Sequence, residues 1–166
     1  VSERRVMIDQ SLDPTEDPKM EGRYRFTIAH ELGHWELHRH YVAGDPRQGV
    51  LFQDDSEPSI VCRSKSHKDP MERQADIFAS YLLMPKAEVF VAWESTFGTR
   101  DPYLALDEIT ELQDRWNIGE GEMLPTVEIS RDLAPAFQVS GQAMQIRLID
   151  LGLVQVRSPG ANLFSA

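Results

Sequence analysis

The sequence predicts a mostly helical α+β domain in which a small mixed or antiparallel sheet accompanies the helices. Three observations indicate this class. Long segments carry apolar residues at helical spacing, a few short runs are β-branched, and two short helical segments near the C-terminal end are joined by a tight turn. With 166 residues, 41% of them hydrophobic, the chain is long enough for one domain with a substantial core.

The first predicted elements are a strand, a connector and a long helix. Residues 3–10 alternate polar and apolar side chains, which indicates a strand, and residues 11–22 contain two prolines and a glycine, which is typical of a turn-rich connector. Residues 23–37 carry apolar side chains at helical spacing. Glycine inside a helix costs about 1 kcal/mol relative to alanine, so Gly33 indicates that another part of the backbone approaches this helix closely.

The stretch after this helix is polar and ends at a strong helix start. Asp69 and Pro70 suit the N-cap and first turn of a second helix, and Met84-Pro85 separates that helix from a third. Short strands are expected in the polar stretch, at 50–52 and 60–62. The remaining elements are helices over 103–116, 127–137 and 141–151, and a strand over 153–156. The last two helices resemble a helix-turn-helix.

The strongest functional signal is the run His30-Glu31-Leu32-Gly33-His34 inside the first helix. Residues four apart lie on the same face of a helix, so the two imidazoles can bind one metal ion. The glutamate between them lies close enough to act as a general base on a water molecule at that ion. The motif therefore predicts a metal site with two histidine ligands and a catalytic glutamate.

A catalytic zinc site needs a third protein ligand and keeps one position open. Glu72 is the main candidate, because it begins the second helix and Asp76 follows on the same face. Asp76 is then expected to hold one ligating imidazole in the required tautomer. The alternative is that Glu72 only closes a capping box with Asp69. Two histidines and a carboxylate suit one zinc ion, and also manganese or iron.

Other residues are candidates for a third ligand or for contact with a substrate. His40 follows His34 at the spacing of a third ligand in some zinc proteases, although Leu37 stands where those proteases have a glycine. His38 better suits a cap at the helix C-terminus, where a partial positive charge is favourable. The candidates for contact with a substrate or transition state are His38, His67 and Tyr81.

Three segments together resemble the ImmA/IrrE family of metallopeptidases. They are Arg25–His38, Glu72–Pro85 and, more weakly, Leu133–Leu153. The resemblance implies a zincin-like core over residues 1–100 and a helical, helix-turn-helix-like region over 101–166 that packs on it. One departure is Gln74, where a second acidic residue is common in the family.

The resemblance also implies an activity and a set of roles. The chain would be an intracellular zinc-dependent endopeptidase that cleaves a specific regulatory protein, such as a helix-turn-helix repressor. His30, His34 and Glu72 would be the metal ligands and Glu31 the base.

Composition narrows the expected partners and compartment. The net charge of −10 argues against broad binding to a phosphate backbone, and no apolar run reaches the roughly 18 residues of a membrane span. Cys62 is the only cysteine, which excludes an internal disulfide and favours a cytoplasmic setting. The resemblance implies a protein substrate, and the composition adds the expectation that neither nucleic acid nor a membrane is a partner.

The competing interpretation is a regulator that binds DNA or a partner protein and carries a latent or inactive metal site. The last predicted helix offers three side chains that can read base edges: Gln142, Gln145 and Arg147.

Overall fold

The computed structural model describes residues 6–43, 70–119 and 123–156. Within these ranges the chain is mostly helical, which confirms the predicted class. The helices are α1 (Glu21–Ala43), α2 (Pro70–Leu83), α3 (Lys86–Phe97), α4 (Leu106–Trp116), α5 (Glu128–Phe137) and α6 (Gly141–Asp150). The 3-10 helices η1 (Gln10–Leu12) and η2 (Pro18–Met20) precede α1, and the strands are β1 (Tyr103–Leu104) and β2 (Val154–Gln155).

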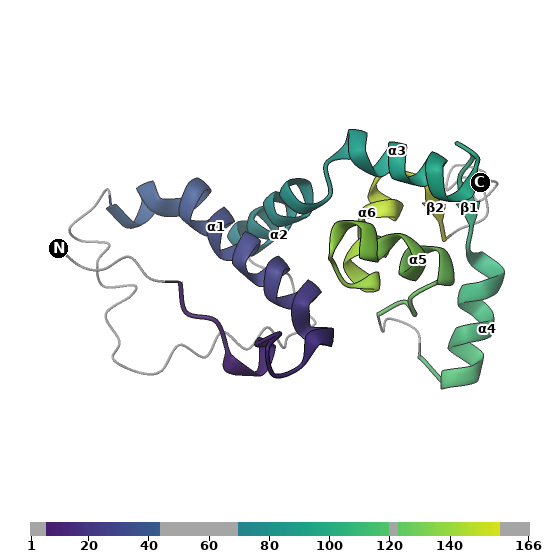
Figure 1. Ribbon diagram of the computed structural model, residues 1–166, viewed down its shortest axis with the longest axis horizontal. Coiled ribbons are helices and arrows are strands. Elements are labelled where there is room, and N and C mark those ends of the chain that lie inside the picture. The colour runs from purple at the N-terminus through teal and green to yellow at the C-terminus, as the bar shows by residue number, and fades with distance from the viewer. Residues whose placement is uncertain (1–5, 44–69, 120–122, 157–166) are drawn as a thin grey trace, which may run out of the picture.

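The helices gather at two ends of an elongated molecule. Helices α1 and α2 pack against each other at one end, while α3 to α6 and both strands lie at the other (Figure 1). None of the helices in the described ranges combines the length and apolar character that crossing a bilayer requires.

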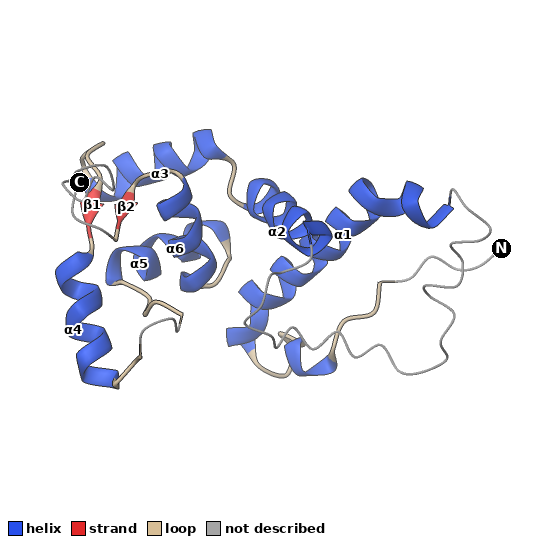
Figure 2. Ribbon diagram, turned by 180° about the vertical axis from the view of Figure 1, so that it is seen from behind, coloured by secondary structure: helices blue, strands red, loops and turns tan. Residues whose placement is uncertain are grey.

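The sheet differs from the prediction. Strand β1 pairs with β2 in parallel, with Tyr103 opposite Val154 and Leu104 opposite Gln155, so within the described residues the predicted mixed or antiparallel pairing is wrong. Both strands lie at the far end from α1, not beside the helix that carries the histidine motif (Figure 2). Parallel pairing follows from the connection, because a chain that passes through three helices before it returns makes a crossover. The strand predicted over 153–156 is confirmed as β2, whereas residues 103–104 form β1 and not the start of a helix.

The strand predicted over residues 3–10 is also wrong for the part that the structure describes. Asp9 accepts a hydrogen bond from the backbone N–H of Ser11 at 2.8 Å, which starts η1 at Gln10. Val6 and Met7 are exposed, so the alternating pattern has no sheet against which to bury its apolar face. The strands expected at 50–52 and 60–62 lie outside the described residues.

The core joins α3 to the C-terminal helices. Trp93 of α3 is buried together with Leu133 of α5 and Leu148 of α6, and its ring meets that of Phe97 edge to face. Helix α3 therefore shares its core with residues beyond 101, although the predicted boundary at residue 100 places α3 with the N-terminal part; that boundary stays a prediction.

Local sequence signals explain where the C-terminal helices begin and end. Ser140 caps α6 by accepting a hydrogen bond from the N–H of Ala143 at 3.1 Å, and three residues, 138–140, join α5 to α6. At the end of α3, Gly98 adopts a left-handed conformation with φ 68° and closes the helix, as its position in the sequence indicates.

Helices α1 and α2 touch where their side chains are small. A Cβ at Gly33 would lie 3.1 Å from the Cα of Ala75, and Ala75 and Ala79 are fully buried. The close approach predicted from Gly33 is therefore confirmed. The close packing at Gly33 also brings polar side chains of α1 and α2 into contact with each other.

A second glycine connects α1 to the C-terminal helices. A Cβ at Gly22 would lie 2.6 Å from the backbone nitrogen of Ser140 and 2.7 Å from the carbonyl carbon of Val139. Such contacts force the backbone to move. We expect Gly22→Ala to lower the free energy of unfolding by about 1–3 kcal/mol, measured by urea denaturation.

Gly33→Ala is the comparison for this prediction, because it adds the same methyl group to the same helix. Its nearest contacts are longer, at 3.1 Å, so the loss should be smaller. A Gly22→Ala protein as stable as the wild type would contradict the close contact between α1 and the turn before α6.

Candidate metal centre

Three side chains on α1 and α2 place ligand atoms next to one another. His30 and His34 stand one turn apart on α1, and their Nε2 atoms are 3.0 Å apart. Glu72, in the first turn of α2, places Oε2 at 3.2 Å from His30 Nε2 and Oε1 at 3.2 Å from His34 Nε2. Among the residues that the structure describes, these three form the group that could hold a metal ion.

The spacing of these atoms fits a zinc ion. Two ligand atoms at 2.0–2.1 Å from one tetrahedral zinc are about 3.3 Å apart. The two Nε2 atoms are 3.0 Å apart, and each lies 3.2 Å from a different oxygen of Glu72, so these separations are close to that value. Two imidazole nitrogens and a carboxylate are also the donor types of catalytic zinc sites. The residues therefore fit the group, while the ligand roles of His30, His34 and Glu72 stay proposals. Asp69, the partner in the alternative capping box, lies outside the described residues.

Asp76 contacts His30 at Nδ1, the ring nitrogen that does not face the other ligand atoms. Its Oδ1 lies 3.0 Å from His30 Nδ1, one turn along α2 from Glu72. The Nδ1–H donates to the carboxylate, which leaves the lone pair of Nε2 directed toward the other ligand atoms. This hydrogen bond is the main reason that the pKa of His30 is raised. Burial opposes the rise, and the charges of Asp76, Glu72 and Glu31 add to it.

The raised pKa of His30 makes a prediction about the metal-free protein. Asp76→Asn should lower the pKa of His30 toward 6.5, because it removes the largest cause of the rise. A histidine whose pKa is raised by folding stabilises the native state below its unfolded pKa, and this contribution disappears as the pH rises through the folded value. NMR titration of the imidazole, with stability measured on both sides of that range, tests this prediction.

The matched control is Asp132→Asn, at an exposed position on α5. It should leave the titration of His30 unchanged. An Asp76→Asn protein with the wild-type pKa at His30 would show that the carboxylate does not act on this imidazole.

Glu31 follows His30 on α1 and is partly buried. Its carboxylate contributes to the raised pKa of His30, so its charge acts at the group of ligand atoms. Its role as the general base stays a prediction.

The cap predicted for His38 is wrong. Helix α1 continues to Ala43, so His38 lies within the helix and is only 3% exposed. Its Nδ1 lies 3.0 Å from His34 Nδ1, and its Nε2 lies 2.9 Å from Gln74 Oε1. Neither contact was predicted from the sequence, although the spacing of His38 from His34 indicates the first of them.

Of the other candidates, Tyr81 is the one whose side chain the structure describes. It is exposed, and its ring centroid lies 4.3 Å from the guanidinium carbon of Arg147. Helix α1 passes through Leu37 without the turn that ligation by His40 requires, and the side chain of His40 lies outside the described residues. His67 also lies outside them.

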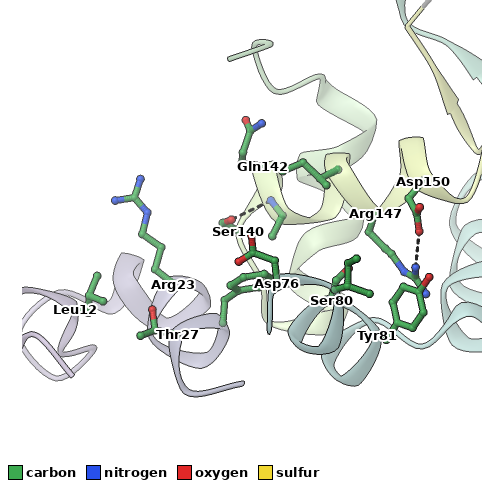
Figure 3. A pocket seen from close by; sticks show the side chains of 14 residues that line it. Leu12, Arg23, Thr27, Asp76, Ser80, Tyr81, Ser140, Gln142, Arg147 and Asp150 are labelled. Carbon is green, nitrogen blue, oxygen red and sulfur yellow. Dashed lines mark hydrogen bonds and ion pairs between the residues drawn. The ribbon is translucent and has the colours of Figure 1, made fainter. Parts of the chain in front are cut away.

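A cavity of about 520 Å³ lies between α1, α2 and α6. Asp76 lines it, and so connects the cavity to His30 (Figure 3). Three exposed apolar side chains also line it: Ile77, Tyr81 and Ile146. No sequence signal predicts this cavity, because α6 is distant in the chain from the other two helices.

Comparison with known proteins gave one family. The model of the Peptidase_M78 family, described as the IrrE N-terminal-like domain, matches residues 15–148. This range contains His30, His34 and Glu72 as well as the start of α6. No curated protein and no solved structure matched.

Proposed function

Because this chain belongs to the Peptidase_M78 family, the family of the IrrE N-terminal-like domain, we propose that it is a zinc-dependent endopeptidase that cleaves a specific regulatory protein, such as a helix-turn-helix repressor. The family supports the coarser activity, that of a metallopeptidase. One observation supports the choice of zinc and of Glu31 as the base: the candidate ligand atoms of His30, His34 and Glu72 converge next to Glu31 at the spacing of a zinc site.

The mechanism assigns each side chain a task. His30, His34 and Glu72 would hold the zinc ion, which when bound acts as a Lewis acid that makes water more acidic and polarises a carbonyl oxygen. Glu31 accepts the proton of the attacking water. It then passes that proton to the amine nitrogen as the peptide C–N bond breaks. Asp76 keeps the hydrogen of His30 on Nδ1, so that Nε2 remains free to bind.

A peptide substrate needs a surface beside the reacting group. The cavity between α1, α2 and α6 offers apolar side chains, and it is lined by Asp76, the residue that contacts His30. Arg147 and Asp150, which pair with each other, also line it on α6 (Figure 3). We expect this cavity to receive an apolar side chain of a protein substrate.

The DNA-binding alternative requires side chains of α6 that are free to contact base edges. The three candidates have hydrogen-bond partners within the protein instead. Gln145 is 1% exposed, accepts a hydrogen bond from the N–H of Val127 and donates one to the carbonyl of Pro125. Arg147, 3% exposed, donates to the carbonyl of Met84 and pairs with Asp150. Gln142 accepts a hydrogen bond from Thr126. These side chains hold α6 in place, so the structure favours the peptidase.

The experiment combines metal analysis with a cleavage assay. The purified protein should contain one zinc per chain and convert a helix-turn-helix repressor encoded beside its gene into discrete fragments. A chelator should stop cleavage, and added zinc should restore it. A zinc-loaded protein that binds the repressor without cleaving it would support the inactive-scaffold alternative. Salt-dependent shifts of DNA in a gel would support the DNA-binding one.

A further inference from the structure

We propose that His38 and Gln74 form a positioning pair that fixes the tautomer of His34 and thereby aims its Nε2 at the metal. This inference rests on the metal site of the proposed function, but it does not depend on peptide hydrolysis. It assigns a task to His38, a buried histidine of α1 that is not among the three proposed ligands.

The contacts of His38 carry the inference. This side chain is 3% exposed in the interior of α1, and both of its ring nitrogens have partners. Nε2 lies 2.9 Å from Gln74 Oε1 on α2, and Nδ1 lies 3.0 Å from His34 Nδ1. Buried polar atoms are costly without a partner, so the imidazole is held in this orientation from both sides.

The chemistry of the partners determines which ring nitrogen carries the hydrogen in His38 and in His34. A side-chain amide oxygen only accepts, so His38 Nε2 carries the hydrogen and donates it to Gln74. A neutral imidazole has one hydrogen, which makes His38 Nδ1 an acceptor. His34 Nδ1 must then be the donor in the contact between the two rings.

The consequence reaches the metal group. With its hydrogen on Nδ1, His34 has a free lone pair on Nε2, the atom that lies 3.0 Å from His30 Nε2 and 3.2 Å from Glu72 Oε1. His30 reaches the same state through Asp76. Helix α2 therefore orients both histidines, one directly through a carboxylate and the other through His38.

The first test reads the tautomers in the metal-free wild type. Nitrogen-15 NMR of the imidazoles at a mildly alkaline pH should show the hydrogen of His34 on Nδ1 and that of His38 on Nε2. If the hydrogen of His34 resides on Nε2, the inference is overturned. This reading decides the matter even for a protein without peptidase activity.

The second test measures zinc affinity by competition with a chromophoric chelator. His38→Phe keeps a ring of similar size but removes the acceptor, and it should weaken zinc binding about 10–100-fold. Gln74→Leu, at an exposed position, should weaken binding by about tenfold and mix the tautomers of His34. Gln74→Glu should keep the wild-type zinc affinity and the wild-type tautomer of His34, because a carboxylate also accepts from His38 Nε2–H.

Controls separate this effect from a general loss of structure. Gln10→Leu makes the same change at an exposed glutamine outside α1 and α2, and it should bind zinc as the wild type does. Thermal melts show whether each variant folds; if His38→Phe does not fold, Gln74→Leu still decides. Wild-type affinity and an unchanged tautomer in Gln74→Leu would overturn the role of the pair.

Discussion

Glu31→Gln is expected to leave zinc bound and to lower kcat for repressor cleavage about 10²–10⁴-fold. Glutamine keeps the size and polarity of the side chain but cannot accept the proton of the attacking water. The zinc ligands proposed here are His30, His34 and Glu72, so zinc stoichiometry should stay at the wild-type value. Single-turnover cleavage rates, measured together with zinc content on the same preparations, check both halves of this expectation.

Glu36→Gln is the matched control, since it makes the same substitution at an exposed position of α1. Its kcat should match that of the wild type. If Glu31→Gln retains full activity while it binds zinc, a different group removes the proton and the mechanism proposed above is wrong.

Glu72→Ala is expected to lower zinc affinity by more than the roughly 10–100-fold that the loss of an outer partner of a ligand costs, because it removes a ligand itself. Its two carboxylate oxygens lie 3.2 Å from the Nε2 atoms of His30 and His34, so both histidines lose the same neighbour. Cleavage should fall with the fraction of zinc bound. Chelator competition gives the affinity, and activity at rising zinc concentration shows whether the loss is one of binding.

Helix α3 offers a precise control for this variant. Glu88 is the third residue of α3, as Glu72 is the third residue of α2, and it is exposed. Both carboxylates stabilise the start of their helix through the helix dipole, so both alanine variants should lower Tm slightly. Only Glu72→Ala should lower zinc affinity. Equal zinc affinity in the two variants would show that Glu72 stabilises the start of α2 and is not a metal ligand.

The helices were predictable because their signals are local. Pro70 begins α2, Gly98 ends α3 and Ser140 caps α6, each through contacts within a few residues of the chain. The spacing of His30 and His34 is also a local property, since an α-helix alone places their side chains on one face.

The strands were harder to predict because a two-residue strand depends on its partner. Nothing in Tyr103–Leu104 indicates pairing with Val154–Gln155, because three helices lie between these two strands in the chain. An alternating pattern such as that of residues 3–10 forms a strand only where a sheet is present to accept it.

The sequence by itself determined which side chains can bind a metal ion and which helix carries the proposed base, because those properties follow from residue type and helical spacing. Only the tertiary structure decided what surrounds them. The crossing of α1 and α2 at Gly33 brings Glu72 to both histidines, Asp76 to His30, and Gln74 to His38. Those contacts join residues more than thirty positions apart, and they depend on how closely two backbones approach, which no local pattern specifies.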